Sequence, residues 1–204
     1  MVLLAAASRA REQIERIEPY KRRNSNATPG PAACSMEMPM PAKRLRAFLD
    51  SHNVAYMTMP HAVAYTAKEI TALTHISNKE LAKTVIVKID GTLAMAVLPA
   101  SYDVDLLALR AATKAKSATL AKESEFKDRF PECDIGAMPP FGNLYGMAVY
   151  VDESLTKDKD IAFNAGTHEE LLQVSYADFA RLATPTVLRF SELPDPESMG
   201  AWHL

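Results

Sequence analysis

Three short stretches of the sequence combine residue types that could do chemistry. The first is residues 134–143, in which Gly136 and Gly142 permit backbone angles that other residues resist, while Pro139 and Pro140 fix φ and have no N–H. A loop of this kind can bring peptide N–H groups close to a ligand, as in sites for phosphates, carboxylates and oxyanions. The same composition is also typical of a plain turn between two strands.

The other two stretches contain a basic or titratable side chain. Lys83 stands at the start of an apolar, β-type run, where its ammonium group must reach solvent or meet an anion, because burying it unpaired is costly. Residues 164–168, Asn-Ala-Gly-Thr-His, have the composition of a turn that ends in a histidine. His168 can exchange protons near neutral pH, although a single histidine in a turn is more often an ordinary surface residue.

The sequence contains none of the common motifs of other catalytic centres. It has no nucleophile elbow, no zinc-protease helix, no Cys-x-x-Cys pair, no dinucleotide-binding glycine motif and no Walker loop. His52, His61 and His75 have no carboxylate or cysteine at metal-ligand spacing, so we expect neither a metal nor a cofactor. Cys133 could be a nucleophile, but a single cysteine more often packs as a small apolar residue.

The composition is that of an ordinary globular protein. Of 204 residues, 48% are hydrophobic and 24% charged, no apolar run is long enough to span a membrane, and two cysteines make no disulfide framework. We therefore expect a cytoplasmic protein. Lys and Arg outnumber Asp and Glu by nine to four in residues 1–46, whereas the ratio is four to ten in residues 150–204. This balance predicts at most a local nucleic-acid contact and no DNA specificity.

The chain divides by composition into three parts. Residues 1–40 begin with a partly helical pattern and continue into a Pro-, Gly- and Ser-rich stretch, so we expect a disordered or partly helical extension. Because Met36, Met38 and Met40 directly precede the regular pattern, this extension could reflect an upstream start codon. We expect one domain over residues 41–192 and a short tail over residues 193–204.

The elements that would position the three stretches can be read from periodicity. Asp90-Gly91 separates two apolar runs and predicts a hairpin in the middle of a sheet, because both runs are almost continuously apolar. Thr66 and Glu69 match a capping box that opens a helix. The remaining strands are expected at 55–59, 147–151, 160–163, 171–175 and 186–190, and the remaining helices at 41–49, 103–112, 122–130 and 175–182. Leu106, Leu107 and Leu109 are expected to face inward. The pattern predicts a mixed sheet with helices packed around it.

In order and spacing, the three stretches resemble the YbaK/prolyl-tRNA-synthetase-associated domain family over about residues 41–190. The similarity lies in Ala82-Lys83-Thr84 at the opening of a strand, in Val97-Leu98-Pro99-Ala100 at a strand end, in the Gly-x-x-x-Pro loop 136–140, and in the turn 164–168. The resemblance implies an α+β single domain with a mixed, partly curled β-sheet, and an aminoacyl-tRNA deacylase that acts on mischarged tRNA. The implied partners are the acceptor end of tRNA and an aminoacyl-tRNA synthetase.

The resemblance also implies roles for individual residues. Lys83 would hold the terminal adenosine or its phosphate, and Gly136 would supply backbone N–H groups to the ester oxygen, so these two are the expected catalytic residues. The expected substrate-binding residues are Thr84, Ala137, Met138, Pro139, Pro140, Asn164, Gly166 and His168. Met138 departs from the small or polar residue that the family often has there.

Two functions remain open at this point. In the first, water hydrolyses the ester of a small amino acid, of the Ala, Cys, Ser or Thr class, with help from the 2′-hydroxyl of the substrate. In the second, the domain binds an amino acid or aminoacyl-tRNA without turning it over. The absence of a protein nucleophile is compatible with both.

Overall fold

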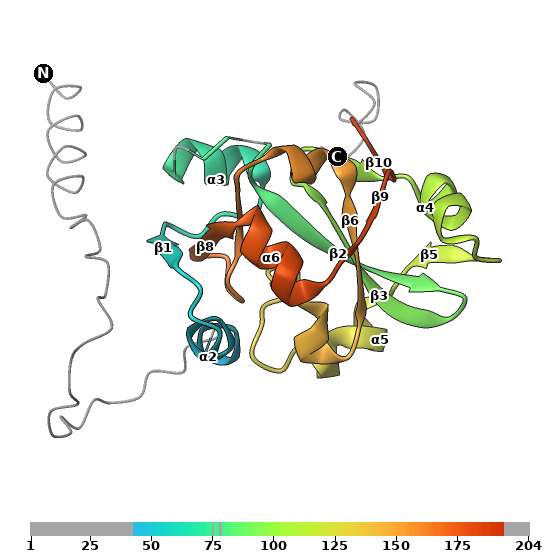
Figure 1. Ribbon diagram of the computed structural model, residues 1–204, viewed down its shortest axis with the longest axis horizontal. Helices are drawn as coiled ribbons and strands as arrows, with labels where there is room; N and C mark the ends of the chain where they lie inside the picture. Colours follow the sequence, from blue (N-terminus) through green and yellow to red (C-terminus); the bar gives the residue numbers. More distant parts are fainter. Residues whose placement is uncertain (1–42, 75, 78, 194–204) are drawn as a thin grey trace, which may run out of the picture. The chain divides into compact units, whose positions relative to one another are not determined.

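The computed structural model of the protein describes residues 43–74, 76–77 and 79–193 (Figure 1). The predicted extension at residues 1–40, the tail from residue 194 onward and the first two residues of the helix predicted at 41–49 lie outside these ranges. The division of the chain into an extension, a domain and a tail therefore stays a prediction.

A β-hairpin forms the centre of the largest sheet. Its strands are β2 (Ala82–Ile89) and β3 (Thr92–Pro99), which pair antiparallel along their whole length. Between them Asp90 and Gly91 have φ angles of 48° and 82°. Positive φ at both central positions is the geometry of a type I′ turn, which matches the twist of the flanking strands. The predicted hairpin is confirmed.

Three more strands extend this hairpin into a mixed five-stranded sheet. β5 (Ala118–Leu120) pairs antiparallel with β2 on one side. On the other side β6 (Ala148–Asp152) runs parallel to β3, and β9 (Thr186–Leu188) runs parallel to β6. The strand order is β5-β2-β3-β6-β9. The sequence pattern did not predict β5, which is only three residues long.

The remaining strands form two smaller sheets. β1 (Tyr56–Pro60), β8 (Glu170–Ser175) and β7 (Asp160–Asn164) make an antiparallel sheet in that order. β4 (Asp103–Val104) pairs with β10 (Ser191–Glu192). A parallel bridge between Leu81 and Ala162 connects the start of β2 to β7. The predicted α+β class with a mixed sheet is confirmed, with its strands distributed over three sheets.

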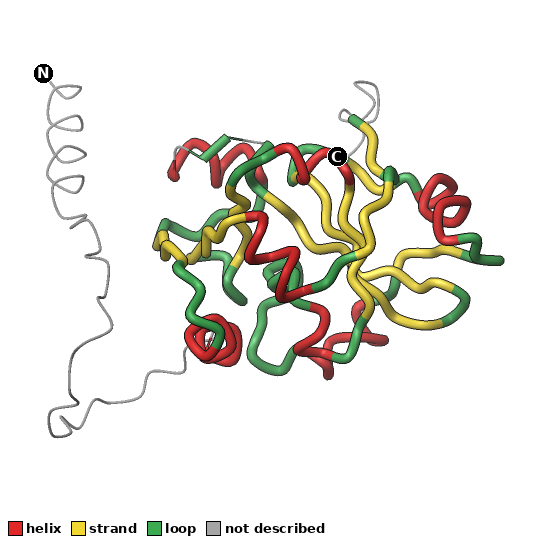
Figure 2. Tube along the Cα trace, in the orientation of Figure 1, coloured by secondary structure: helices red, strands yellow, loops and turns green. Residues whose placement is uncertain are grey.

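Helices surround the strands, as Figure 2 shows. The α-helices of the described residues are α2 (Lys43–Ser51), α3 (Ala67–Thr74), α4 (Leu106–Thr113), α5 (Glu123–Phe126) and α6 (Tyr176–Ala183). Short 3-10 helices are η1 (Lys127–Arg129), η2 (Gly142–Tyr145) and η3 (Glu153–Lys157).

The five-stranded sheet is buried on both faces. Met95 of β3 packs in one core cluster with Leu49 of α2 and Phe179 of α6. Ala96, which points to the opposite face of the same strand, packs with Leu109 of α4. Two covered faces explain why β2 and β3 are apolar almost without alternation, as the sequence predicted.

Two predicted helices differ in extent from the structure. The first starts at Leu106 rather than at residue 103, because Asp105 caps it by accepting hydrogen bonds from the backbone N–H groups of Leu107 and Ala108, both at 2.9 Å. The inward orientation expected for Leu107 was wrong, since this residue is 69% exposed. The helix predicted at 122–130 is divided into α5 and η1.

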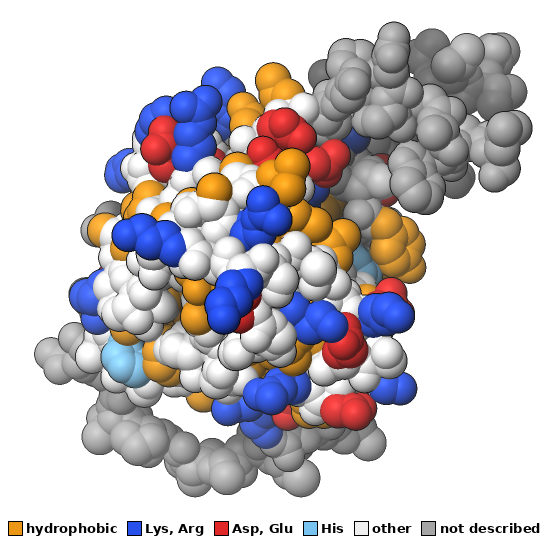
Figure 3. Space-filling model, turned by 90° about the vertical axis from the view of Figure 1, so that its right-hand side faces the viewer, with side chains coloured by type: hydrophobic (Ala, Val, Ile, Leu, Met, Phe, Trp, Pro, Cys, Tyr) orange, Lys and Arg blue, Asp and Glu red, His pale blue; other side chains and the backbone are white. Residues whose placement is uncertain are grey.

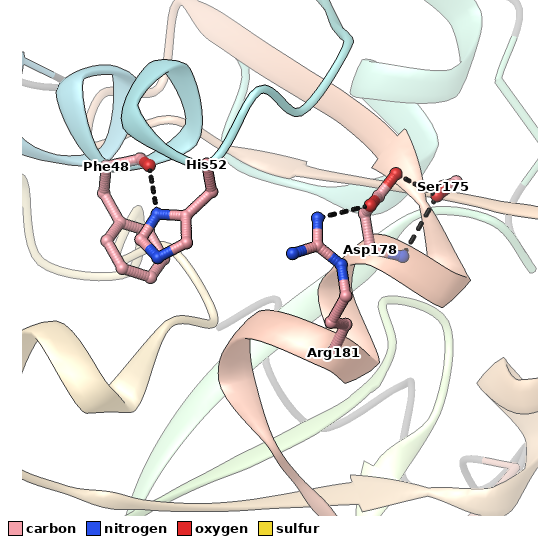
Figure 4. Close-up of polar contacts among 5 residues, drawn as sticks. All are labelled: Phe48, His52, Ser175, Asp178 and Arg181. Carbon is pink, nitrogen blue, oxygen red and sulfur yellow. Dashed lines mark hydrogen bonds and ion pairs between the residues drawn. The ribbon is translucent and has the colours of Figure 1, made fainter.

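Side-chain caps fix the starts of α3 and α6. Thr66 and Glu69 form the predicted capping box: the Glu69 carboxylate accepts from the Thr66 N–H at 3.0 Å, and the Thr66 hydroxyl accepts from the Glu69 N–H at 3.2 Å. At α6 the Ser175 hydroxyl accepts from the Asp178 N–H (Figure 4). Figure 4 also shows His52, whose Nδ1 lies 2.8 Å from the carbonyl oxygen of Phe48 at the end of α2.

A buried carboxylate at the end of β6 binds the backbone of Phe190 and Ser191, where β10 starts. Asp152 is 2% exposed, and its two oxygens accept hydrogen bonds from the Ser154 N–H and hydroxyl and from the Phe190 and Ser191 N–H groups, at 2.6–3.0 Å. Burial by itself raises the pKa of Asp152, but the hydrogen bonds from Ser154, Phe190 and Ser191 lower it below the usual value for aspartate.

We predict that Asp152→Asn lowers the free energy of unfolding at pH 7 by about 1–3 kcal/mol, because hydrogen bonds to a charged acceptor are lost. The folded-state pKa of Asp152 lies below its unfolded value of about 3.9. The stabilisation is therefore present above pH 4 and is lost as the pH falls through the folded-state pKa.

Urea unfolding of the wild type and the variant at pH 7 and below pH 3 measures this effect. Glu153→Gln, at the exposed neighbouring position, is the control and should change stability little at either pH. Equal stability of Asp152→Asn and the wild type at pH 7 would contradict the assignment.

Candidate active site

A buried phenylalanine holds one end of the Pro/Gly loop. The Phe141 ring is fully buried and contacts three aromatic rings edge-on: Phe163 of β7 at 5.7 Å, Phe179 of α6 at 5.6 Å and Phe48 of α2 at 6.1 Å between ring centroids. The next residue, Gly142, has no room for a side chain, since a Cβ there would lie 2.6 Å from the carbonyl oxygen of Met147. The loop is therefore fixed to three elements at this end.

Hydrogen bonds join the loop to the turn at 164–168. The Asp134 N–H donates to the Gly166 carbonyl at 2.8 Å, and the Gly166 N–H donates to the Ala137 carbonyl at 3.0 Å. His168 Nε2 lies 3.0 Å from the Ile135 carbonyl oxygen. The structure therefore brings together two of the three stretches that the sequence singled out.

The contact with Ile135 indicates which nitrogen of the His168 ring carries a proton. A carbonyl oxygen only accepts hydrogen bonds, so His168 Nε2 must carry the proton. In the neutral ring Nδ1 is then an acceptor, and this atom is buried without a hydrogen-bond partner among the described residues. The ring thus presents an unused lone pair inside the protein.

Two more of the predicted site residues carry a buried polar atom of this kind. Asn164 Oδ1, at the end of β7, and Thr84 Oγ1, in β2, have no hydrogen-bond partner in the described part of the chain. Thr84 lies on the same face of β2 as Ala82 and Ile86, which belong to the core cluster of Met138 and Ala165. Most buried polar groups in proteins are paired, so an unpaired atom on each of these three residues is unusual.

The Gly136 N–H has an unusual acceptor. Gly136 has a φ of +91°, and its N–H donates to the thioether sulfur of Met138 at 3.2 Å. Met138 is 5% exposed and packs in the core, so its side chain folds back along the loop. A thioether is a weak acceptor, which leaves this N–H available to a stronger one. Ala137, Pro139 and Pro140 are buried beside it.

Lys83 is not connected to the loop or the turn by a hydrogen bond or ion pair among the described residues. Its Nζ lies 3.2 Å from Oδ1 of Asp103, and the two side chains are 33% and 61% exposed. Alternation along β2 places Lys83 on the face opposite Thr84. Because an exposed ion pair contributes little free energy, the ammonium group can exchange Asp103 for another anion.

Sequence reasoning missed two residues beside the turn. The backbone N–H of His61 donates to the Glu169 carbonyl, and Nδ1 of its ring contacts the Ala62 carbonyl oxygen. Because a carbonyl only accepts, Nδ1 carries the proton and ring Nε2 is the acceptor. Nε2 is buried and has no partner among the described residues. The Tyr65 ring lies against the His168 ring, with centroids 4.7 Å apart. Tyr65 directly precedes the predicted capping box, which holds the backbone in one conformation. An aromatic residue at such a fixed position was the sequence signal that could have pointed to Tyr65.

Cys133 is not activated as a nucleophile. Burial raises the pKa of its thiol, and the hydrogen bond with the Tyr145 hydroxyl only partly opposes this.

The described residues contain no group of three or more His, Cys, Asp or Glu side chains that could hold a metal ion. No helix among them is long and apolar enough to cross a membrane. A polar cavity near Asp152 is lined by Tyr102, Lys157 and Arg189 and includes none of the predicted site residues.

The segment that spans α4 and β5 is rich in basic residues. Residues 106–122 contain no acidic residue and four exposed basic ones, Arg110, Lys114, Lys116 and Lys122. Figure 3 views the side of the molecule that carries α4 and β5, and Lys and Arg side chains are spread over it.

Comparison with known proteins gives consistent results. The family model described as the aminoacyl-tRNA editing domain matches residues 61–182. The multifunctional Ser/Thr-tRNA deacylase ProXp-y of Escherichia coli (strain K12) is 27% identical over 153 residues, which cover 72% of this chain and 91% of the relative.

Solved structures share the fold. The hypothetical protein APE2540 matches with a TM-score of 0.67 at 20% identity, over 74% of this chain and 100% of that chain. A candidate trans-editing enzyme for prolyl tRNA synthetase matches with a TM-score of 0.65 at 19% identity, over 74% and 97%. At these identities the structures establish the fold alone.

The family model covers more than half of the chain, so the protein belongs to the aminoacyl-tRNA editing domain family. This confirms the family that the sequence motifs predicted. Because the named relative is a tRNA deacylase, an enzyme that hydrolyses an ester bond, the predicted enzyme class is confirmed at the level of the family.

We predict that Gly136→Ala disturbs His168 as well as the backbone. The left-handed φ of Gly136 is strained for any residue with a Cβ, and that Cβ would lie 3.3 Å from Cε1 of His168. Gly91→Ala is a matched control, because its φ is also positive but its Cβ would meet nothing within 4 Å.

Thermal unfolding and the ¹H–¹⁵N spectrum of the histidine rings measure the two effects. Both variants should lose about 1 kcal/mol or more of stability. Only Gly136→Ala should shift the His168 ring signals, and unchanged His168 signals in that variant would contradict the described packing.

Proposed function

We propose that this protein hydrolyses the ester bond of aminoacyl-tRNA that carries a small amino acid, with a preference for serine and threonine. The observation that carries this proposal is the combination of unpaired buried acceptors at Asn164 and His168 with the weakly engaged N–H of Gly136, on two segments that hydrogen bonds hold together. The Ser/Thr-tRNA deacylase activity of the named relative supports the same substrate class.

In this proposal the loop stabilises the charge that develops during hydrolysis. Attack of water on the ester carbonyl carbon places negative charge on the carbonyl oxygen. The Gly136 N–H donates to that oxygen in place of the Met138 sulfur, because an oxyanion is a far stronger acceptor than a thioether. Ala137, Pro139 and Pro140 form the rigid wall that keeps this donor in place.

The acceptors on the turn and on β2 would select the substrate. An aminoacyl ester carries an α-ammonium group, whose three donors suit Asn164 Oδ1. Serine and threonine add a side-chain hydroxyl, which can donate to His168 Nδ1 or Thr84 Oγ1. A site that hydrogen-bonds a hydroxyl discriminates strongly against substrates that lack it, because its polar groups then stay unpaired. Gly166 keeps the turn close to the loop without a side chain.

The bond-breaking step in this proposal uses no protein nucleophile. Water adds to the carbonyl carbon, the bond to the ribose 3′ oxygen breaks, and the neighbouring 2′-hydroxyl relays a proton to the leaving oxygen. The protein supplies orientation and electrostatic stabilisation. The raised pKa of the Cys133 thiol is consistent with such a mechanism.

The tRNA would contact the protein beyond the ester. Lys83 would bind a phosphate near the terminal adenosine, in exchange for its exposed ion pair with Asp103. The basic residues at 106–122 suit the phosphate backbone. A synthetase partner and a cytoplasmic location stay predictions.

We predict that the purified protein releases amino acid from Ser-tRNA and Thr-tRNA faster than from Ala-tRNA. Asn164→Ala should lower kcat/KM on Ser-tRNA by about 10- to 100-fold, because a buried hydrogen bond to a charged group is lost. Asn143→Ala, at an exposed asparagine of η2, is the matched control and should retain full activity.

Acid-precipitable counts from tRNA charged with radiolabelled amino acid measure these rates. Release at the buffer rate for every small amino acid, together with tight binding, would contradict the proposal and favour the non-catalytic binding module. Equal rates on Ser-tRNA and Ala-tRNA would contradict the hydroxyl-binding role.

We predict that Lys83→Ala removes most of the activity, chiefly by raising KM, since the lost group binds phosphate. Lys88→Ala is the matched control, because Lys88 stands on the same strand and has its own ion pair, with Glu125 at 2.7 Å. Steady-state kinetics on Ser-tRNA separate KM from kcat. Full activity of Lys83→Ala would show that Lys83 serves only its surface ion pair with Asp103.

A further inference from the structure

An exposed apolar rim lies beside His168. It consists of Val63, Tyr65 and Ile135, which are 50%, 72% and 44% exposed. Tyr65 packs against the His168 ring, and the Ile135 carbonyl accepts the His168 Nε2 hydrogen bond. These apolar side chains are therefore neighbours of the site, although they take no part in the chemistry proposed above.

The backbone that carries Tyr65 is held on both sides. The Ala64 N–H donates to the His168 carbonyl at 3.0 Å, which fastens the segment to the turn. The Glu69 carboxylate accepts from the N–H groups of both Tyr65 and Thr66, at 3.1 Å and 3.0 Å. Tyr65 is therefore a largely exposed aromatic side chain on a backbone segment that hydrogen bonds hold in place.

A flat, exposed ring next to an esterolytic site suits one kind of ligand. Unpaired bases of RNA are commonly bound by stacking on aromatic side chains, and such stacking tolerates any base. In aminoacyl-tRNA the nucleoside that bears the ester is itself a single-stranded base at the 3′ end. Its base must therefore lie within one nucleoside of the carbonyl that the site holds.

We propose that Tyr65 is the stacking platform for the terminal nucleobase of the tRNA 3′ end, flanked by Val63 and Ile135. This inference rests on the proposed function, because it requires the ester to sit at the Gly136 loop and His168. It gives Tyr65 a positioning role: the stacked base orients the ribose, and the ribose presents the ester to the loop.

Binding is tested with an RNA hairpin that has a single-stranded 3′ end and 2-aminopurine as its terminal base. Stacking on wild-type protein should quench its fluorescence. Tyr65→Phe should keep the quench and the affinity, whereas Tyr65→Leu should lose the quench and bind about 5- to 100-fold more weakly. Val187→Ala, an exposed apolar position on β9, is the control and should match the wild type.

A matched hairpin without the terminal base separates stacking from a structural role. On this RNA the wild type and Tyr65→Leu should bind equally. If Tyr65→Leu weakens both RNAs alike, or if Tyr65→Phe fails as badly as Tyr65→Leu, the stacking role is overturned, and Tyr65 only covers His168. Melting temperatures equal to the wild type confirm that the variants are folded.

Turnover distinguishes failure of this inference from failure of the proposed function. On Ser-tRNA, Tyr65→Leu should raise KM by about 5- to 100-fold while kcat changes less. If the wild type hydrolyses Ser-tRNA and Tyr65→Leu has the same KM and kcat as the wild type, only the stacking role is overturned. Tyr65-dependent quenching without any hydrolysis would support the stacking role and overturn the deacylase function.

Discussion

The burial of Phe141 is the interaction on which the rest of the site depends. Its ring contacts Phe48, Phe163 and Phe179, which belong to α2, β7 and α6, so one side chain fixes the loop to three separate elements. The buried Met138 side chain and the hydrogen bonds to the turn hold the other end of the loop, so the loop N–H groups keep a defined direction. Preorganised donors are what electrostatic catalysis requires.

Three of the predicted site residues leave a buried polar atom without a hydrogen-bond partner among the described residues. Each buried polar atom without a partner costs about 1–3 kcal/mol. Thr84, Asn164 and His168 all carry such an atom. Asn164 and His168 belong to the turn, and Thr84 lies on the face of β2 whose Ala82 and Ile86 pack in the same core cluster as Met138. Asp152 is the opposite case, since four donors satisfy it completely and its role is structural. Under the proposed function a bound substrate would satisfy Thr84, Asn164 and His168, whereas Asp152 is satisfied by the protein itself.

Local signals predicted much of the fold. Asp90-Gly91 fixed the hairpin because two consecutive positive φ angles favour these residue types, and Thr66 and Glu69 fixed the start of α3 because each satisfies the other's free N–H. The pattern failed at Leu107, since leucines at i, i+1 and i+3 spread over about 160° of the helix, which is wider than the stripe that α4 buries. It also missed β5, whose three residues are paired by the rest of the sheet rather than by their own propensity.

The sequence by itself determined the family, the hairpin, the caps and the identity of the residues around the loop and the turn, because these depend on residue type and short spacing. Only the tertiary structure decided which of these residues meet. It joined the loop to the turn through hydrogen bonds between segments some thirty residues apart. It also turned Met138 back onto the Gly136 N–H and set Lys83 on the other face of β2 from Thr84. It also placed Tyr65 against His168, because stacking of two rings distant in sequence depends on how the sheets and loops pack.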